Sequence, residues 1–116
     1  MCTGSLVLAI HDTMNVISGK WKLPIVGALL EGRKRFSELA KVIPSITPRM
    51  LSKELKELEM NGIVTRTVYD TIPVSVEYEL TPSGYSIREV LDVMVSWGQK
   101  HRRSVMGVKT AAKRRA

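Results

Sequence analysis

A chain of 116 residues with 44% hydrophobic content is long enough for one globular domain and too apolar for a disordered segment. It contains no apolar run of about 18 residues and no signal-peptide pattern, so we expect a cytoplasmic protein without a membrane partner. Its single cysteine and two distant histidines exclude an intramolecular disulfide and a zinc site, and we expect no metal or other cofactor.

The net charge of +7 is unevenly distributed along the chain. Residues 1–66 carry 10 basic and 6 acidic residues, residues 67–99 carry 1 and 5, and residues 100–116 carry 7 and none. We predict that residues 1–103 form one domain and that residues 104–116 form a flexible basic tail.

Two short helices are predicted at the start of the chain. Residues 10–17 have the pattern of a helix, whereas residues 1–9 have no strong pattern. A second helix is predicted from Lys20 to Gly32, with an apolar face formed by Trp21, Ile25, Ala28 and Leu29.

A helix-turn-helix is predicted between Phe36 and Asn61. Its first helix has an apolar face and ends at Pro44, and a turn of about four residues leads to the second helix. The hydroxyl of Thr47 can cap that second helix, and Pro48 suits the first helical position, where a missing N–H costs nothing. The second helix therefore begins at a well-defined residue.

This second helix has two opposite faces. At 100° per residue, one face is apolar and consists of Leu51, Leu55 and Leu58. The opposite face is basic and polar, and consists of Arg49, Ser52, Lys53 and Lys56. A solvated surface helix is the alternative, because three glutamates are also present. The basic residues gather in the first turns and on the far face, which favours a helix that reads DNA.

After Gly62 the hydrophobic period changes from 3.6 to 2. Alternation over residues 63–69 and 74–80, with a turn at residues 70–73, predicts a β-hairpin. A hairpin directly after a recognition helix is a wing, and Arg66 is the charge that would serve it.

A long helix is predicted from Pro82 to about His101. Its apolar residues cover an arc of about 200°, wider than the stripe of somewhat over 100° that packing on one core requires. We therefore expect it to pack on a partner subunit as well. The alternative is that a fold this small wraps the helix more fully. The residues predicted to form the dimer contact are Ile87, Val90, Leu91, Met94 and Trp97.

These parts resemble the HxlR-type family of winged helix-turn-helix transcriptional regulators. The resemblance spans about residues 8–101, and its motifs lie at residues 17–22, 35–39, 49–59, 61–64, 76–81 and 97–98. It implies a mainly α fold with a small β-hairpin, in a bacterial dimeric regulator that binds operator DNA through the winged helix and dimerises through its terminal helices. Leu8 occupies the position where thiol-sensing members carry a cysteine. Cys2 lies six residues upstream, so we expect no thiol response.

We therefore expect a sequence-specific transcriptional regulator that binds double-stranded DNA at an inverted-repeat operator as a homodimer. The residues predicted to contact base edges are Arg49, Ser52 and Lys53. Those predicted to contact phosphates, or in the case of Arg66 to approach the minor groove, are Lys34, Arg35, Thr47, Lys56 and Arg66. The sequence identifies no small-molecule effector.

Three other functions are a protein–protein interaction module, RNA binding and enzymatic activity. A winged helix can serve as a protein–protein interaction module without sequence-specific DNA binding, and this is the main alternative. RNA binding is disfavoured, because the chain has a single Phe and no exposed aromatic pairs in its strands. An enzyme is not expected, because no nucleophile-elbow motif or metal-spaced cluster is present, and His11 and His101 are far apart in sequence.

Overall fold

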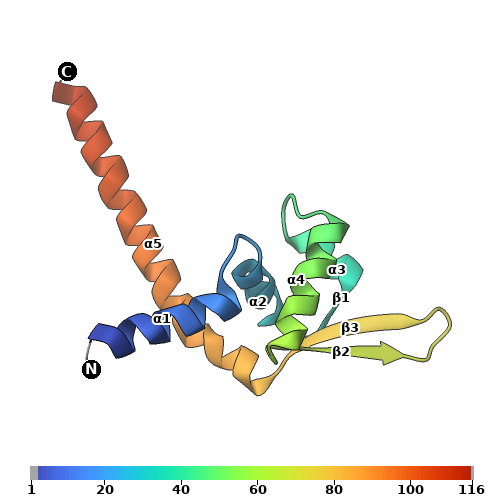
Figure 1. Ribbon diagram of the computed structural model, residues 1–116. Coiled ribbons are helices and arrows are strands. Elements are labelled where there is room, and N and C mark those ends of the chain that lie inside the picture. The colour runs from blue at the N-terminus through green and yellow to red at the C-terminus, as the bar shows by residue number, and fades with distance from the viewer. Residues whose placement is uncertain (1–2, 116) are drawn as a thin grey trace.

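The computed structural model describes the backbone of residues 3–115 and the side chains of residues 3–106. The winged helix-turn-helix that was predicted is confirmed, with a three-stranded antiparallel sheet beside the helices (Figure 1). The elements in chain order are α1 (Thr3–Ile17), α2 (Lys22–Leu29), β1 (Lys34–Arg35), α3 (Phe36–Val42), α4 (Pro48–Met60), β2 (Val64–Tyr69), β3 (Ser75–Leu80) and α5 (Pro82–Arg115).

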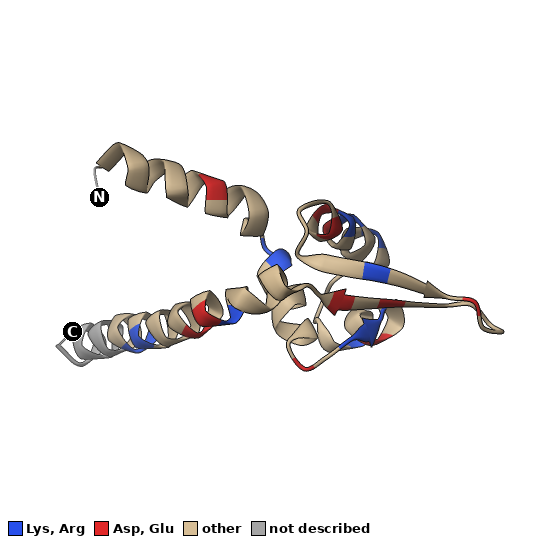
Figure 2. Cartoon of the chain, turned by 90° about the horizontal axis from the view of Figure 1, so that it is seen from below, with Lys and Arg blue, Asp and Glu red and all other residues tan. Residues whose placement is uncertain are grey.

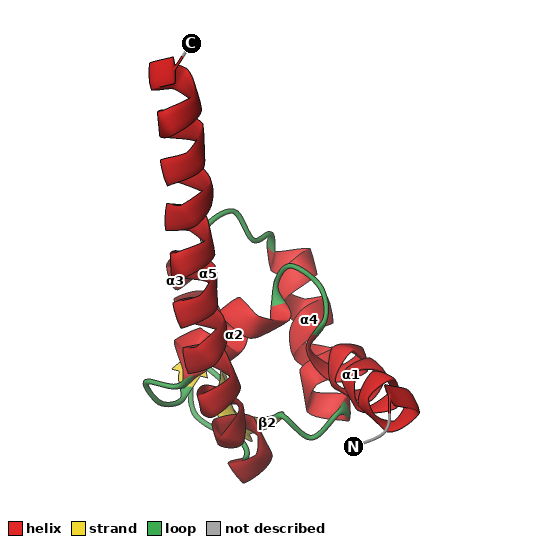
Figure 3. Ribbon diagram, turned by 90° about the vertical axis from the view of Figure 1, so that its left-hand side faces the viewer, coloured by secondary structure: helices red, strands yellow, loops and turns green. Residues whose placement is uncertain are grey.

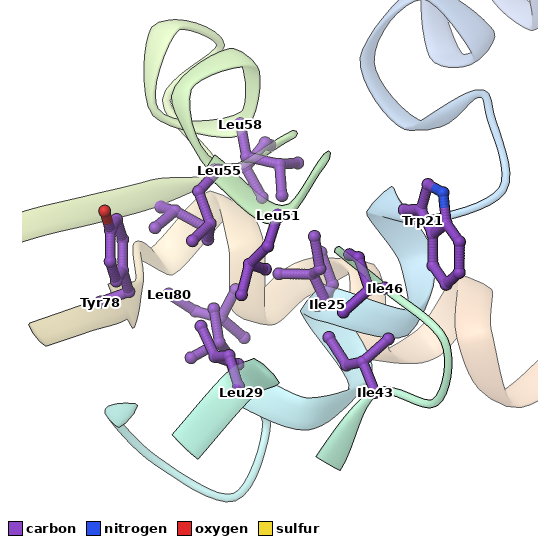
Figure 4. Close-up of a cluster of buried hydrophobic side chains, with 14 residues drawn as sticks. Trp21, Ile25, Leu29, Ile43, Ile46, Leu51, Leu55, Leu58, Tyr78 and Leu80 are labelled. Atoms are coloured by element: carbon purple, nitrogen blue, oxygen red, sulfur yellow. The ribbon is translucent and has the colours of Figure 1, made fainter. Parts of the chain in front are cut away.

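The hydrophobic core lies between α2, α3, α4 and the sheet. The leucine row predicted for the second helix of the helix-turn-helix is confirmed: Leu51, Leu55 and Leu58 are at most 1% exposed. They point toward Ile25 and Leu29 of α2 in Figure 4. Full burial of such a side chain contributes about 1.5–3 kcal/mol. The row therefore fixes which face of α4 points away from the protein.

Both ends of α4 are closed by hydrogen bonds. The Met50 N–H donates to Thr47 Oγ1 at 3.2 Å, so the predicted N-terminal cap is confirmed. At the other end Gly62 adopts a positive φ of 73°, and the Ile63 N–H donates to the Leu58 carbonyl at 2.9 Å. This is the Schellman arrangement, in which glycine supplies the left-handed residue that an L side chain rarely adopts.

The end of α4 is tied directly to the start of α5. Thr81 Oγ1 donates to the Gly62 carbonyl at 2.6 Å and accepts from the Gly84 N–H at 3.1 Å. The Thr81 N–H also donates to the Ile63 carbonyl at 3.0 Å. One residue thus caps α5 and holds it against the C-terminus of α4.

The sheet has the strand order β1-β3-β2, and the short edge strand β1 was not predicted. Residues 34 and 35 were expected only as a basic segment before α3, yet they pair with Tyr78 and Glu77 of β3. The hairpin is confirmed, although its second strand begins at Ser75 and the exposed Val74 belongs to the turn. The edge strand escaped the pattern analysis because two residues are too few to show a period.

The ends of the chain form two helical arms that diverge from the winged-helix body (Figures 1 and 3). The first arm, α1, begins at Thr3 and not near residue 10 as predicted. The second arm, α5, continues to Arg115, whereas an end near His101 was predicted. α2 spans Lys22–Leu29 and is shorter than expected. The flexibility predicted for residues 104–116 stays a prediction, and their side chains from residue 107 lie outside the described residues.

The arms make the protomer elongated. Its radius of gyration is 18.1 Å, whereas a compact domain of this length has about 13 Å. Within the described residues, no helix is both long enough and apolar enough to cross a lipid bilayer.

We expect Gly84→Ala to destabilise the fold. A Cβ at this position would lie 2.3 Å from the carbonyl oxygen of Ile63, a backbone atom that cannot move without disturbing the start of β2. Relieving that overlap should lower the free energy of unfolding by about 1–3 kcal/mol, as measured by urea denaturation.

The matched control is Gly27→Ala in α2, where an added Cβ meets no heavy atom within 4 Å. Since alanine is the better helix former, this variant should be more stable than the parent by up to about 1 kcal/mol. Equal midpoints for the two variants would contradict the close approach of Gly84 to β2.

Candidate nucleic-acid interface

The outer face of α4 is cationic and solvent-exposed. The structure brings together the four residues predicted for this face, and all four are exposed: Arg49, Ser52, Lys53 and Lys56. From the first to the last of them the helix advances about 10 Å, or two turns. A B-DNA major groove is about 12 Å wide and admits one α-helix. The size and charge of this face suit that groove.

The N-terminus of α4 adds polar groups beside this face. Thr47 is exposed, and its hydroxyl oxygen accepts from Met50, which leaves the hydroxyl proton for an outside acceptor. The unpaired N–H groups of the first turn give the helix N-terminus a partial positive charge, which favours an anion. This end of α4 can therefore receive a phosphate.

The basic segment before α3 divides into three differently placed cations. Lys34 is half-buried, and its Nζ lies 3.4 Å from Glu31 Oε2, so its charge is already partly neutralised. The side chain of Arg35 is exposed, and its backbone N–H donates to Glu38 Oε1 at 3.0 Å. Arg33 was not among the predicted site residues. It is exposed, and its Nη1 donates to the Tyr69 hydroxyl at 3.1 Å.

Arg66 lies on the wing, on the sheet face that also carries the core. It pairs with Tyr78 in the register, and opposed residues in an antiparallel pair share a face. Val64 and Leu80, two residues closer to α4, are buried on that same face. The exposed Arg66 side chain therefore extends the α4 side of the sheet beyond the edge of the core.

The winged-helix body carries many charged residues, whereas α1 carries few (Figure 2). Figure 2 shows lysine, arginine and acidic positions on the winged-helix body, whereas α1 is almost entirely uncharged. The cationic face of α4 thus belongs to the body, and the N-terminal arm has little charge with which to attract DNA.

A buried ion pair behind α4 was not predicted. Lys22 of α2 is 8% exposed, and its Nζ donates to Glu54 Oε2 at 2.7 Å and also to Glu57 Oε2. Both glutamates belong to α4. The periodicity of α4 had placed its glutamates to the sides of the basic face, but nothing in the sequence paired them with a lysine 32 residues away.

The charges of this cluster stabilise one another. Burial alone would lower the pKa of Lys22, but the hydrogen bonds that it donates to Glu54 and Glu57, together with the negative charges of these two residues, outweigh burial and raise that pKa above its usual 10.5. The hydrogen bond from Lys22 holds the pKa of Glu57 below its usual 4.5. Lys22 and Glu57 are therefore both charged around neutral pH, and the Lys22 ammonium lies between two glutamate side chains.

Comparison with known proteins identifies the family of this helix-turn-helix. The HxlR-like helix-turn-helix model matches residues 16–106. The chain belongs to the HxlR-like helix-turn-helix family. The chain is similar to the HTH-type transcriptional regulator YtcD of Bacillus subtilis, with 43% identity over 100 residues that cover 86% of this chain and 79% of YtcD.

Solved structures of other transcriptional regulators have the same fold as this HxlR-like chain. The reduced form of the redox regulator HypR has a TM-score of 0.79 at 40% identity, covering 85% of this chain and 98% of HypR. A MarR-family transcriptional regulator from Enterococcus faecalis V583 has a TM-score of 0.75 at 34% identity, covering 90% of this chain and 92% of that protein. The chain is thus a transcriptional regulator with a helix-turn-helix DNA-binding fold, and the resemblance found in the sequence is confirmed.

Redox regulation is a property stated for HypR. Cys2 lies outside the described residues, so the expectation that it has no thiol response stays a prediction. Within the described residues, no group of three or more His, Cys, Asp or Glu side chains could hold a metal ion.

The Lys22 cluster predicts a specific dependence of stability on pH. A carboxyl whose folded pKa is depressed contributes stability above its usual pKa and loses that contribution as the pH falls through the folded value. We therefore expect Glu57→Gln to be less stable than the parent at pH 7, and the difference to shrink below about pH 4.5. Urea unfolding at pH 7 and pH 3.5 measures it. A difference that is the same at both pH values would contradict the ion pair.

Proposed function

We propose that this chain is a homodimeric regulator that binds an inverted-repeat operator in a sequence-specific manner, with α4 in the major groove and the hairpin as a wing. The observation that carries this proposal is the exposed cationic face of α4, held outward by the buried leucine row on the opposite side. A DNA partner places the protein in the cytoplasm.

Each candidate residue has a role within this proposal. Arg49, Ser52 and Lys53 contact base edges, since they lie in the first turns of α4 and arginine can bind guanine through two hydrogen bonds. Phosphate contacts come from the surrounding groups, namely Thr47, Lys56, Arg35, Lys34 and Arg66. Lys34 contributes least among these, because Glu31 already neutralises part of its charge.

The homodimer is supported by apolar side chains that one protomer leaves in water. On α1 the exposed residues are Leu6, Val7, Leu8, Ile10 and Met14, and on α5 they are Val90, Val93, Met94, Val95 and Trp97. Residues 3–15 of α1 are exposed, and an unsupported helix of about 12–15 residues is marginal in water. A second copy that covers both arms would stabilise them.

The residues of α5 that were predicted to form the dimer contact fall into two groups that differ in burial. Ile87 and Leu91 are partly buried against the core of their own protomer. Val90, Met94 and Trp97 are 44–65% exposed. We therefore propose that the second group makes the contact with the partner. The first group anchors the arm to the body.

A first test separates DNA reading from a protein–protein role. A duplex is selected from a random-sequence pool on the parent protein, and binding is measured by fluorescence anisotropy. We expect Arg49→Ala/Lys53→Ala to weaken binding to the selected duplex by at least about 10-fold, because each good base contact contributes about 1–3 kcal/mol.

The control for this test is Arg88→Ala/Lys100→Ala, which removes the same net charge from exposed positions on α5. It should retain affinity within about 3-fold. Failure of the parent to enrich any sequence, or equal loss in the two double variants, would favour the protein–protein interaction module.

A second test concerns the dimer. Val90→Asp/Met94→Asp places two charges in the proposed contact, where desolvation penalises them, so sedimentation velocity should detect a monomer at micromolar concentration. The control is Ile72→Asp, since Ile72 is a fully exposed apolar residue in the turn of the wing and lies outside the arms. A dimer that survives the double substitution would rule out this surface.

A further inference from the structure

An ion-pair cluster connects α4 to α2 through two hydrogen bonds between side chains. Among residues 3–106, Lys22 is the one charged residue that is buried. Its Nζ donates to Glu54 Oε2 at 2.7 Å and also to Glu57 Oε2. The side chain of Glu54 is 15% exposed and that of Glu57 is 41% exposed. The cluster thus lies along the flank of α4, between the core and solvent.

We propose that Lys22 is a positioning residue that sets the rotation of α4 about its own axis and thereby the sequence preference of the protein. This inference rests on the proposed DNA-binding function. Lys22 itself is buried, so it cannot donate to a phosphate or a base. Any effect of its removal on DNA binding must therefore pass through α4.

The leucine row alone does not fix this rotation closely. Contacts between apolar side chains are non-directional, and cores tolerate repacking when volume and pattern are kept. Charged hydrogen bonds are short and directional. Because Glu54 and Glu57 are three residues apart, they lie on one side of α4, and two bonds to a single ammonium hold that side against α2.

Base reading is more sensitive to such a rotation than phosphate binding. A binding constellation must be held within about 0.5 Å and 10–20° of its productive geometry. Long cationic side chains can follow a phosphate through a small rotation, whereas bidentate contacts with a base edge cannot. Loss of Lys22 should therefore reduce the preference for one sequence more than the affinity for DNA in general.

A competing role for Lys22 is charge compensation alone. α4 carries three cations (Arg49, Lys53, Lys56) and three carboxylates (Glu54, Glu57, Glu59), so its own charges cancel and Lys22 adds the one positive excess. Leaving two carboxylates unpaired would repel phosphates. Such repulsion would weaken binding to every duplex alike, and neutralising the carboxylates would relieve it fully.

The experiment compares the parent with Lys22→Met, the triple variant Lys22→Met/Glu54→Gln/Glu57→Gln, and Lys22→Arg. Affinities are measured by anisotropy for the selected duplex and for a scrambled duplex of the same composition. Urea unfolding of each protein gives the folded fraction for correction. Lys20→Met is the matched control, since Lys20 is exposed, lies two residues earlier, and has its Nζ over the Trp21 ring at 4.8 Å from the ring centroid.

We expect Lys22→Met to lower the ratio of the two affinities at least 5-fold, with an unchanged salt dependence on the scrambled duplex. The triple variant should not restore the ratio, Lys22→Arg should restore most of it, and Lys20→Met should equal the parent. An unchanged ratio in Lys22→Met, or full recovery in the triple variant, overturns the positioning role.

Three further outcomes bear on the proposal. If Lys22→Met does not fold, Glu57→Gln leaves one carboxylate for Lys22, and its ratio should fall by at least 2-fold; no fall overturns the proposal. A parent that does not distinguish the two duplexes overturns the proposed function together with this inference. A parent that distinguishes them while every Lys22 variant does so equally overturns this inference alone.

Discussion

The fold depends first on the burial of one face of α4. Leu51, Leu55 and Leu58 lie at the centre of the core, where α2, α3 and the sheet surround them. Since an α-helix turns by 100° per residue, holding these three positions inward forces Arg49, Lys53 and Lys56 outward. The apolar and cationic faces are thus two consequences of one constraint. The caps at Thr47 and Gly62 then fix where this helix begins and ends.

In the proposed function, α4 carries as many carboxylates as cations and needs those carboxylates kept away from DNA. The pairing of Glu54 and Glu57 with Lys22 does so on the inner flank of α4. Buried ion pairs contribute little net stability, because desolvation offsets much of the Coulomb attraction. Their better attested effect is to favour one arrangement over its near neighbours, and this is the role that fits a helix whose orientation decides what it reads.

The arms leave apolar side chains uncovered in the single chain. Their apolar side chains are exposed, and the protomer is longer than a compact domain of its size. The body reads DNA in the proposed function, and the arms set the separation of two bodies. In a twofold dimer this separation has to match about one DNA turn, 34–36 Å. Packing of the arms would then decide operator spacing, while α4 decides operator sequence.

The sequence by itself determined the parts of the protein that follow from local chemistry and period. The α4 cap at Thr47, its leucine row, its cationic face and the hairpin all depend on residues close together in the chain, and each was predicted. The true extents of α1 and α5 were missed, because helices that leave their apolar residues in water show no clean boundary in the pattern.

Only the tertiary structure decided which distant residues meet. It paired Lys34 and Arg35 with β3 and packed Ile87 and Leu91 of α5 against the core. It also brought Lys22 to Glu54 and Glu57. A lone lysine and two glutamates 32 and 35 residues away have no period and no motif in common. Their pairing follows from the packing of α2 against α4, which only the folded core establishes.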